Sequence, residues 1–322
     1  MSTRSLTGIH HITAIASDPQ RYLDFYTTVL GLRLVKLTIN FDDPETYHFY
    51  FGNEEGTPGS ILTFFPWPGA SRGVVGSGQV SAPALAIPLG SDQYWRSRLS
   101  RLGVPVTDGG ERFGETVLVV LDPDGLPLEL VATAHANPAL AWKDAPIDVE
   151  HAICGFHSAT LSEEGYEQTA RLLTETMGFA AVAEEGNRYR YQAGSGGAGA
   201  MVDLLCTPDG RSGRLGAGTV HHIAWRTPDD EQQLQWHDEL ARLGYNVTPV
   251  VDRNYFHSIY YREPGGVLFE IATDPPGFAI DEPKAHLGER LMLPHQYEPA
   301  RAELEDILPR LTLPTARPKG AR

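Results

Sequence analysis

Cysteine is nearly absent from this chain. Only Cys154 and Cys206 occur among the 322 residues. Two cysteines so widely spaced make neither a disulfide framework nor a Cys-x-x-Cys metal site. Disulfides are a feature of oxidising compartments, so their expected absence favours a cytoplasmic location.

Basic residues and long apolar runs are also scarce. Lysine and arginine number 26 against 41 acidic residues, which gives a formal net charge of −15. No basic stripe is available to neutralise phosphates, and this argues against nucleic acid as a partner. No apolar segment approaches the ~20 residues of a membrane span, and the first residues do not resemble a secretory signal, so no membrane partner is expected.

The remaining composition is that of a soluble chain with a sizeable core. Hydrophobic residues make up 41% of the sequence and charged residues 21%. The length suggests about two domains of ordinary size.

One frame recurs four times: a glycine is followed, four positions later, by a polar or acidic residue at the end of an expected strand. The copies read Gly59-Ser-Ile-Leu-Thr63, Gly125-Leu-Pro-Leu-Glu129, Gly199-Ala-Met-Val-Asp203 and Gly266-Val-Leu-Phe-Glu270. A repeat of this kind indicates one small unit present in four copies.

Three of the four copies also carry a histidine in a strand-like segment about fifty residues upstream. These are His11 in Gly-Ile-His-His-Ile-Thr, His157 in Gly-Phe-His-Ser-Ala-Thr and His222 in Val-His-His-Ile-Ala-Trp. Histidines and carboxylates at matching places in related units can converge on one metal ion.

The first copy shows how each unit is expected to fold. Ile9 to Ala16 alternates like a strand, and Ser17 or Asp18 is a suitable helix N-cap before Pro19. A helix with one apolar face follows, and three further strands complete the unit. The sequence therefore predicts an α+β fold of four βαβββ modules, paired into two cup-shaped or barrel-like domains.

The modules divide the chain into two halves and a tail. The N-terminal half spans 7–134, with modules at 7–66 and 79–134; a linker spans 135–149; the C-terminal half spans 150–276, with modules at 150–206 and 217–274; and a tail with a short helix spans 277–322. We expect the tail to pack on the body of the protein or on a neighbouring subunit.

Residues of the first and last strands of a module are expected to point into the cup. These slots hold His11 and Thr63 in the first module, Glu129 alone in the second, His157 and Asp203 in the third, and His222 and Glu270 in the fourth. Two histidines and one carboxylate on one face of a metal leave three positions open, as in non-haem Fe(II) enzymes that bind substrate and oxygen together. Mn(II) prefers the same ligands.

At this point the chain resembles the vicinal oxygen chelate superfamily, and within it the ring-cleaving dioxygenases that act on hydroquinones. The resemblance covers nearly the whole chain. The stretches that carry it are Gly8-Ile-His-His-Ile-Thr13, Asp43–Gly52 with its Tyr-His-Phe-Tyr, Asp122–Glu129, Val220-His-His-Ile-Ala224, Tyr260–Glu270 and Leu287–Pro294.

The resemblance implies a metal bound by His11, His222 and Glu270. For His11 to be a ligand, the first and fourth modules must share a cup. His157 is the alternative second histidine, as in catechol-cleaving relatives, but it lacks the paired histidine and the Ile-Thr of the other segments. Glu129 is expected to be satisfied locally instead of binding metal.

The resemblance also implies a set of pocket residues, which are His10, Thr13, His221, Arg253 and Tyr260. Strand alternation places His10 and His221 on the face away from the metal, where they could anchor their strands. Tyr260 and Arg253 are expected to contact substrate. His48 lies in an alternating strand and is a further candidate for the pocket.

The implied function is that of an Fe(II)-dependent, extradiol-type ring-cleaving dioxygenase, with Mn(II) as the other metal. Its partners would be a small aromatic diol and O2, and relatives suggest a homo-oligomer. Two alternatives stay open: a glyoxalase-like isomerase that uses Glu129 with Glu270, and a metal-free small-molecule binding protein.

Overall fold

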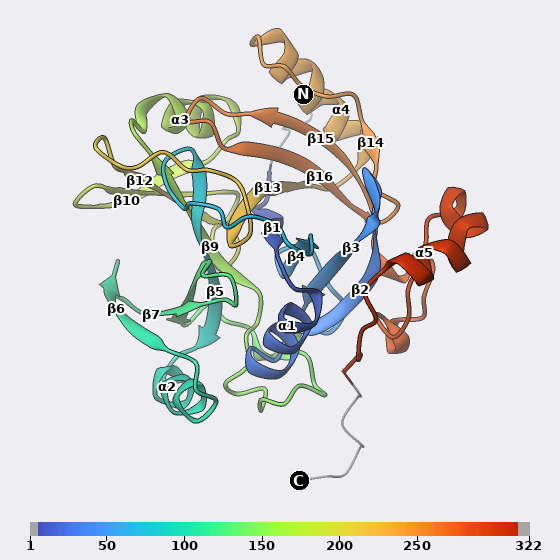
Figure 1. Ribbon diagram of the computed structural model, residues 1–322. Helices are drawn as coiled ribbons and strands as arrows, with labels where there is room; N and C mark the ends of the chain where they lie inside the picture. Colours follow the sequence, from blue (N-terminus) through green and yellow to red (C-terminus); the bar gives the residue numbers. More distant parts are fainter. Residues whose placement is uncertain (1–5, 315–322) are drawn as a thin grey trace.

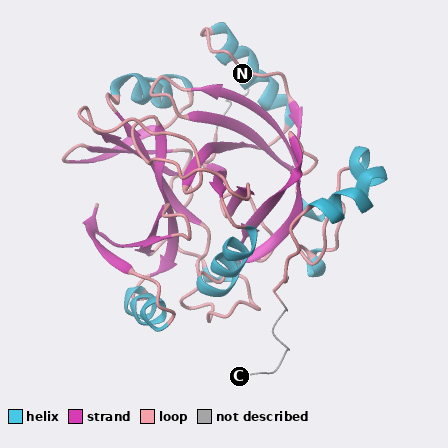
Figure 2. Ribbon diagram, in the orientation of Figure 1, coloured by secondary structure: helices cyan, strands magenta, loops and turns pink. Residues whose placement is uncertain are grey.

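The computed structural model describes residues 6–314 and consists of two curled eight-stranded sheets with few helices (Figures 1 and 2). The strand order is β14-β15-β16-β13-β1-β4-β3-β2 in the first sheet and β10-β11-β12-β9-β5-β8-β7-β6 in the second. The helices lie on the outside of the sheets (Figure 2). The α+β class and the four strand-rich modules are thereby confirmed.

The first sheet combines the first and fourth modules. The first module supplies β1 (Ile9–Ala16), α1 (Pro19–Asp24), the π-helical turn η1 (Phe25–Val29), β2 (Arg33–Asn40), β3 (Asp43–Gly52) and β4 (Ile61–Pro66). The fourth supplies β13 (Thr219–Thr227), α4 (Asp230–Arg242), β14 (Val251–Asp252), β15 (Phe256–Arg262) and β16 (Leu268–Pro276). Antiparallel pairing of β1 with β13 joins the two modules.

The second sheet combines the second and third modules. The second supplies β5 (Gln79–Pro88), α2 (Asp92–Arg101), β6 (Val106–Arg112), β7 (Glu115–Leu121) and β8 (Pro127–Thr133), and is followed by η2 (Pro138–Leu140). The third supplies β9 (Phe156–Glu163), α3 (Glu167–Arg171), η3 (Leu172–Thr176), β10 (Ala180–Glu185), β11 (Arg188–Gln192) and β12 (Met201–Cys206). Here β5 pairs antiparallel with β9.

Each sheet therefore takes one module from each half of the sequence. The condition attached to His11, that the first and fourth modules share a sheet, is met. The segments that connect consecutive modules cross between the sheets side by side, with bridges such as Val74 to Arg214 and Ser77 to Ser212. At the far end of the joint, the amide of Ile9 donates to Gly199 O at 2.7 Å and that of Phe156 donates to Gly59 O at 2.8 Å.

The first helix begins as its sequence predicts. Asp18 is the N-cap, and its carboxylate accepts a hydrogen bond from the amide of Arg21 at 3.0 Å. Pro19 occupies the first helical position, where its missing N–H has no partner to lose. Tyr22 and Leu23 are fully buried in the core, so the helix covers the convex side of the first sheet.

The tail packs on the outside of the first sheet. It contains η4 (Phe278–Ile280), η5 (Lys284–His286), η6 (His295–Ala300) and α5 (Arg301–Ile307). The hydroxyl of Tyr47 donates to Pro309 O at 2.9 Å, and the buried ammonium of Lys36 contacts Asp281 and Glu282. Packing of the tail on the body is thus confirmed for 277–314, whereas 315–322 lie outside the described residues.

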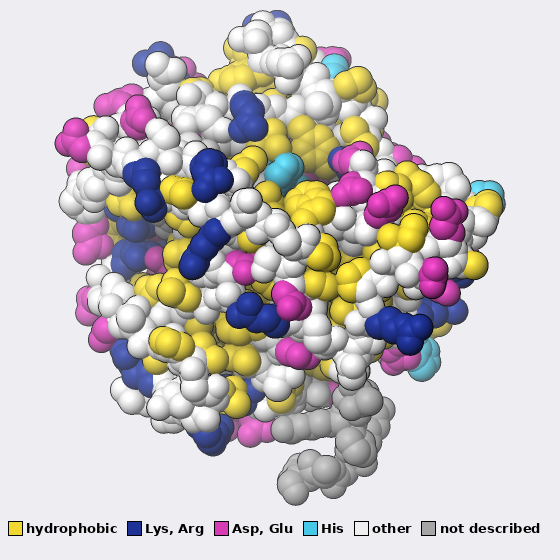
Figure 3. Space-filling model, in the orientation of Figure 1, with side chains coloured by type: hydrophobic (Ala, Val, Ile, Leu, Met, Phe, Trp, Pro, Cys, Tyr) yellow, Lys and Arg dark blue, Asp and Glu magenta, His cyan; other side chains and the backbone are white. Residues whose placement is uncertain are grey.

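The surface carries charges of both signs. On the face drawn in Figure 3, both dark blue and magenta side chains are present. Among residues 6–314, none of the helices combines the length and the apolar character that crossing a bilayer requires.

Candidate metal centre

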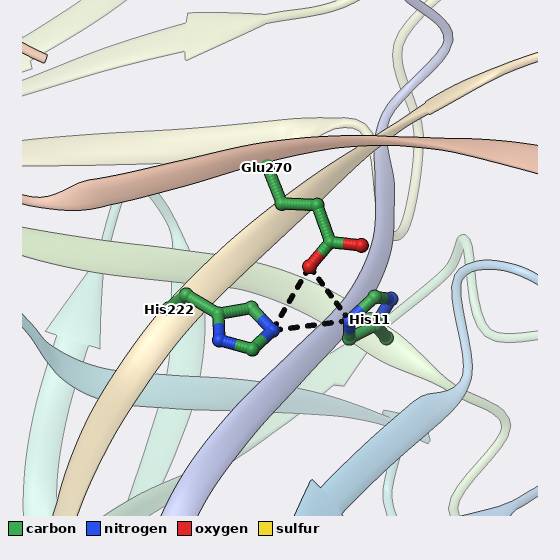
Figure 4. A group of neighbouring side chains, drawn as sticks. All are labelled: His11, His222 and Glu270. Atoms are coloured by element: carbon green, nitrogen blue, oxygen red, sulfur yellow. Dashed lines mark hydrogen bonds and ion pairs between the residues drawn. The ribbon is translucent and has the colours of Figure 1, made fainter. Parts of the chain in front are cut away.

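Three buried side chains meet on the concave side of the first sheet, which we call the first cup. His11 comes from β1, His222 from β13 and Glu270 from β16 (Figure 4). Oε2 of Glu270 lies 2.9 Å from Nε2 of His222 and 3.3 Å from Nε2 of His11, and the two Nε2 atoms are 3.3 Å apart. Their residues are at most 5% exposed. Each of the three residues could offer one ligand atom to a single ion.

Two β-bulges arrange the histidines in neighbouring pairs. In the pairing of β1 with β13, Ile9 faces Trp225 and His11 faces Ala224, so His10 is an extra residue. The same pairing skips His221 on β13. A bulge residue breaks the alternation of side chains, because two residues on one strand then face one on the other.

The bulges bring His10 and His221 beside the ligand rings, and they correct the expected orientation of His221, which lines the cavity, whereas His10 does not. Nδ1 of His10 lies 2.9 Å from Nδ1 of His11, and Nδ1 of His221 lies 2.8 Å from Nδ1 of His222. Each partner therefore holds one ring nitrogen of its neighbour and leaves Nε2 directed toward Glu270. Burial and the adjacent His222 lower the pKa of His221 to about 3, so its ring is neutral.

Glu270 is held in place from the neighbouring strand. The hydroxyl of Ser258 on β15 donates to Oε1 at 2.5 Å, which leaves Oε2 for the two histidines. Burial by itself would raise the pKa of Glu270, but His11 and His222 outweigh it and hold that pKa well below its usual range. The carboxylate is therefore ionised and suited to a cation.

A cavity of about 380 Å³ opens in front of this group. Of the residues expected in the pocket, Thr13, His221, Arg253 and Tyr260 line it; His10 does not, and instead supports His11 from behind. The wall also contains residues that were not expected there. They are Asn40, Phe41, Asp42, Asp43, Tyr50, Phe65, Trp67, Phe256 and Leu268.

Arg253 and Tyr260 form a linked pair at the side of this cavity. Nε of Arg253 donates to the hydroxyl of Tyr260 at 3.1 Å, and its NH1 lies 3.0 Å from Oδ2 of Asp42. Tyr260 faces Glu270 across the β15–β16 ladder. Burial and the charge of Glu270 raise the pKa of Tyr260, so the phenol keeps its proton.

His48 also lines the cavity. It lies on β3, where it is partly exposed between the buried Tyr47 and Phe49, and the sequence left its position in the pocket open. The ring lies between Tyr50 and Phe65, with centroids 4.0 and 4.4 Å away. The alternation of Tyr-His-Phe-Tyr was the available signal, but it does not reveal which face of β3 turns toward the cavity.

His157 occupies a different slot from the one expected. The pairing of β9 with β12 sets Thr160 opposite Asp203, just as β1 sets Thr13 opposite Thr63. Counting back from Thr160 aligns Ser158 with His11 and His157 with the bulge residue His10. His157 lies in the second sheet, where its Nε2 is 2.9 Å from Oε2 of Glu115.

The concave side of the second sheet, the second cup, is filled by ion pairs. Arg112 contacts both oxygens of Glu129 at 2.6 and 2.9 Å, so this carboxylate is satisfied locally, as expected. Arg190 contacts both oxygens of Asp203 at 2.7 and 3.0 Å. Burial would raise the pKa of Glu115, but His157 and Arg190 outweigh it and lower that pKa to about 2.

Comparison with known families matches both halves of the chain to one description. Residues 8–130 and 155–271 match "Glyoxalase/Bleomycin resistance protein/Dioxygenase superfamily". Two curated relatives cover most of the chain. "Putative ring-cleaving dioxygenase MhqO" of Bacillus subtilis is 54% identical over 94% of this chain and 95% of that protein. "Chlorohydroquinone/hydroquinone 1,2-dioxygenase" of Sphingobium indicum is 36% identical over 92% of this chain and 94% of that protein.

A solved structure agrees with the fold described above. The crystal structure of a "putative dioxygenase" from Bacillus subtilis superposes with a TM-score of 0.91 at 52% identity and covers 97% of this chain and 99% of that chain. The two eight-stranded sheets and the crossed module pairing are therefore shared with a close relative.

Proposed function

The chain belongs to the glyoxalase/bleomycin resistance protein/dioxygenase superfamily, and on this premise we propose that it is a ring-cleaving dioxygenase acting on a hydroquinone-type ring. The observation that carries the proposal is the buried group of His11, His222 and Glu270 at the floor of a ring-sized cavity. The names of the two curated relatives point to the same chemistry.

The group fits a metal ion with one open face. Three ligands held at right angles by bonds of ~2.1 Å would lie ~3.0 Å apart, close to the observed 2.9, 3.3 and 3.3 Å. Oε2 of Glu270 is buried, yet it accepts no well-aligned hydrogen bond from the nearby rings. A buried carboxylate oxygen without a hydrogen bond costs folding free energy unless a cation binds it. His11, His222 and Glu270 would hold that cation.

We assign Fe(II), with Mn(II) as the other metal that suits two imidazoles and a carboxylate. When bound, such a metal brings the ring and O2 together and allows electrons to pass between them. The proposed reaction inserts both oxygen atoms and opens the ring beside a hydroxylated carbon, as extradiol-type enzymes do.

The protein's own groups would orient the ring and offset charge. Tyr260 keeps its proton and can donate a hydrogen bond to an ionised ring hydroxyl beside Glu270. Arg253 holds the phenol of Tyr260 and brings a positive charge to the same wall, which favours an anionic ring. Phe65, Trp67 and Phe256 provide flat apolar surface for an aromatic ring and exclude water.

His10 and His221 act on the centre through the ligands. Each holds Nδ1 of the adjacent ligand histidine and so fixes the tautomer that leaves Nε2 free. We therefore place them as positioning residues. Thr13 lines the cavity, and its hydroxyl is 2.8 Å from that of Thr63.

The isomerase alternative needs a second carboxylate beside Glu270, and Glu129 is not placed to supply it. It required Glu129 and Glu270 in one cup, but these residues belong to different sheets, and Arg112 engages both oxygens of Glu129. The metal-free binding alternative does not account for two histidines and a carboxylate brought to a single point. Neither alternative is favoured by an observation of its own.

Oxygen consumption tests the proposal. Protein loaded with Fe(II) under anaerobic conditions is mixed with aerated hydroquinones and catechols, beside an identically treated His222→Ala sample. We expect one O2 consumed per hydroquinone and none in the variant. A metal-loaded protein that consumes no O2 with any ring diol would overturn the proposal.

A further inference from the structure

His48 lines the same cavity as His11 and His222 but comes from a different strand of the first sheet, and its ring is packed between two aromatic rings. It lies on β3, while the ligands come from β1, β13 and β16. Its ring is flanked by Tyr50 and Phe65, with interplanar angles of 34° and 46°. A ring packed between two aromatics in this way presents its nitrogens in fixed directions.

One of the two ring nitrogens is already engaged. Nε2 of His48 lies 2.9 Å from Oγ1 of Thr63, and Oγ1 of Thr63 lies 2.8 Å from Oγ1 of Thr13. Both threonines are fully buried. Among the described residues, Nδ1 of His48 has no hydrogen-bond partner. Burial and the neighbouring His11 keep the pKa of His48 well below its usual range, so one nitrogen donates and the other accepts.

The other polar groups of the cavity are largely occupied. Asp43 accepts hydrogen bonds from Trp67 Nε1 and the hydroxyl of Thr46, and Asp42 is paired with Arg253. The phenol of Tyr260 is held by the same arginine. His48 is thus a cavity residue whose second nitrogen is available for a ligand.

We propose that His48 binds the second hydroxyl of a para-hydroquinone, the one that does not meet the metal. This rests on the proposed function. A catechol carries its second hydroxyl beside the first, near the ligand group, whereas a hydroquinone carries it at the far end of the ring. The distal hydroxyl would then meet Nδ1 of His48 across the cavity.

The threonine chain sets which hydrogen bond His48 can make. When Nε2–H donates to Thr63, Thr63 donates to Thr13, and Nδ1 accepts from the hydroxyl of the ring. When all three bonds reverse, Nδ1–H donates instead. Both arrangements serve a phenol, since a hydroxyl both donates and accepts. A ring with fluorine in place of the distal hydroxyl would satisfy neither well.

Binding without turnover tests the role. We would measure Kd values of hydroquinone and of 4-fluorophenol for metal-loaded protein under nitrogen, by calorimetry, because no ring can be cleaved without O2. Wild type should prefer hydroquinone by about tenfold, the worth of one hydrogen bond to a buried group. His48→Phe should abolish the preference and change the Kd of 4-fluorophenol by about twofold at most.

Two further variants keep the test decisive if the phenylalanine variant does not fold. His48→Gln retains an amide and should keep part of the preference. Thr63→Val leaves the imidazole in place but removes the bond that orders it, and should reduce the preference without abolishing it. The control is His237→Phe on the outer helix α4, which should behave as wild type.

The outcomes separate this inference from the proposed function. A wild type that cleaves hydroquinone, together with a His48→Phe variant that retains the tenfold preference, overturns the role of His48 alone. Equal weakening of both ligands also overturns it, since that pattern marks a merely structural residue. A wild type that opens no ring diol overturns the proposed function instead.

Discussion

The two cups have the same topology, and their concave faces are filled by opposite means. In the first cup a carboxylate and two histidines point at one another in front of a cavity. In the second, each carboxylate in the corresponding region is held by an arginine. The registers of the two sheets allow the positions to be compared residue by residue.

The ligand positions of the first cup have simpler counterparts in the second. Glu270 faces Ala224 on β13, and Glu129 faces Ala84 on β5 in the same way. Ala84 therefore corresponds to Ala224, and two residues earlier on these strands Ala82 corresponds to His222. Ser158 stands at the place of His11. At the positions that correspond to the ligand group, the second cup therefore has one carboxylate, Glu129, and no histidine.

An arginine takes the role of counter-ion in the second cup. Tyr260 faces Glu270 across one hairpin and Val119 faces Glu129 across the other, so Arg112 and Arg253 occupy equivalent places at the ends of β6 and β14. Arg112 forms an ion pair with Glu129, whereas Arg253 donates a hydrogen bond to Tyr260 and pairs with Asp42. The comparison teaches that a buried carboxylate in this fold needs a cation, and that a guanidinium or a metal can supply it.

The largest effect should come from removing the equivalent carboxylates one at a time. Glu270→Gln should lower turnover of hydroquinone by about a thousandfold or more, because the metal loses its anionic ligand. Glu129→Gln should leave turnover within about twofold at low temperature, since its carboxylate only neutralises Arg112. Steady-state O2 uptake on metal-loaded samples checks both. Similar losses in the two variants would break the distinction between the cups.

The second-largest effect concerns stability and should appear only in the second cup. Asp203→Asn leaves Arg190 and Arg188 without their buried counter-ion and should lower the free energy of unfolding by about 3 kcal/mol. Denaturant unfolding measures it. Arg171→Gln, which removes an exposed pair with Glu175, is the matched control and should cost less than ~0.5 kcal/mol. An unchanged midpoint for Asp203→Asn would contradict a structural role for the network.

A smaller effect should follow from Tyr260→Phe, which makes this position of the first cup more like Val119 of the second. The variant should bind metal with unchanged stoichiometry but lose about ten- to hundredfold in kcat, because a hydrogen bond to the reacting ring is removed. Stopped-flow single turnovers with hydroquinone measure it. A fall in metal content instead of kcat would place Tyr260 among the supports of the metal.

The smallest effect lies at the joint between the cups. Glu163 ends β9 in the second sheet, and burial together with Glu263 near the β15–β16 turn raises the pKa of Glu163 to about 8. The folded state therefore holds a proton that the unfolded chain releases above its ordinary pKa near 4.5. Stability from this group is complete below that pH and is lost as the pH rises through 8.

Glu163→Gln should remove this part of the pH dependence. Thermal unfolding would be measured at pH 5.5 and 8.5. Between these two pH values the free energy of unfolding should fall by roughly 2 kcal/mol less in the variant than in wild type. This difference is smaller than ~1.4 kcal/mol for each unit of pKa shift would give, because relaxation of the joint reduces the effect. Parallel curves for the two proteins would show that Glu163 does not titrate as described.

The fold was predictable from the sequence because it depends on repeated local signals, whereas the ligand set of His11, His222 and Glu270 was implied by the family resemblance and stays a prediction. The glycine frame marks the last strand of each module, and Asp18 with Pro19 marks the first helix. Only the repetition of the His-His-Ile segment near His11 and His222 indicated that the first and fourth modules share a sheet.

The remaining features depend on contacts that no local pattern encodes. Strand alternation misplaced His221, because bulges arise from the pairing of two distant strands. The same one-residue shift placed His157 in the wrong slot. Arg112 and Arg190 gave no signal, since their partners lie on neighbouring strands and their role appears only when the second cup is assembled.

The most direct test of the account is the number and location of bound metal ions. Fe(II) bound per chain would be measured after anaerobic loading and desalting, for wild type, His222→Ala and Glu129→Gln. The account predicts one ion in wild type and in Glu129→Gln, and less than a tenth of an ion in His222→Ala. Metal retained by His222→Ala, or lost in Glu129→Gln, would contradict the assignment of the metal to the first cup.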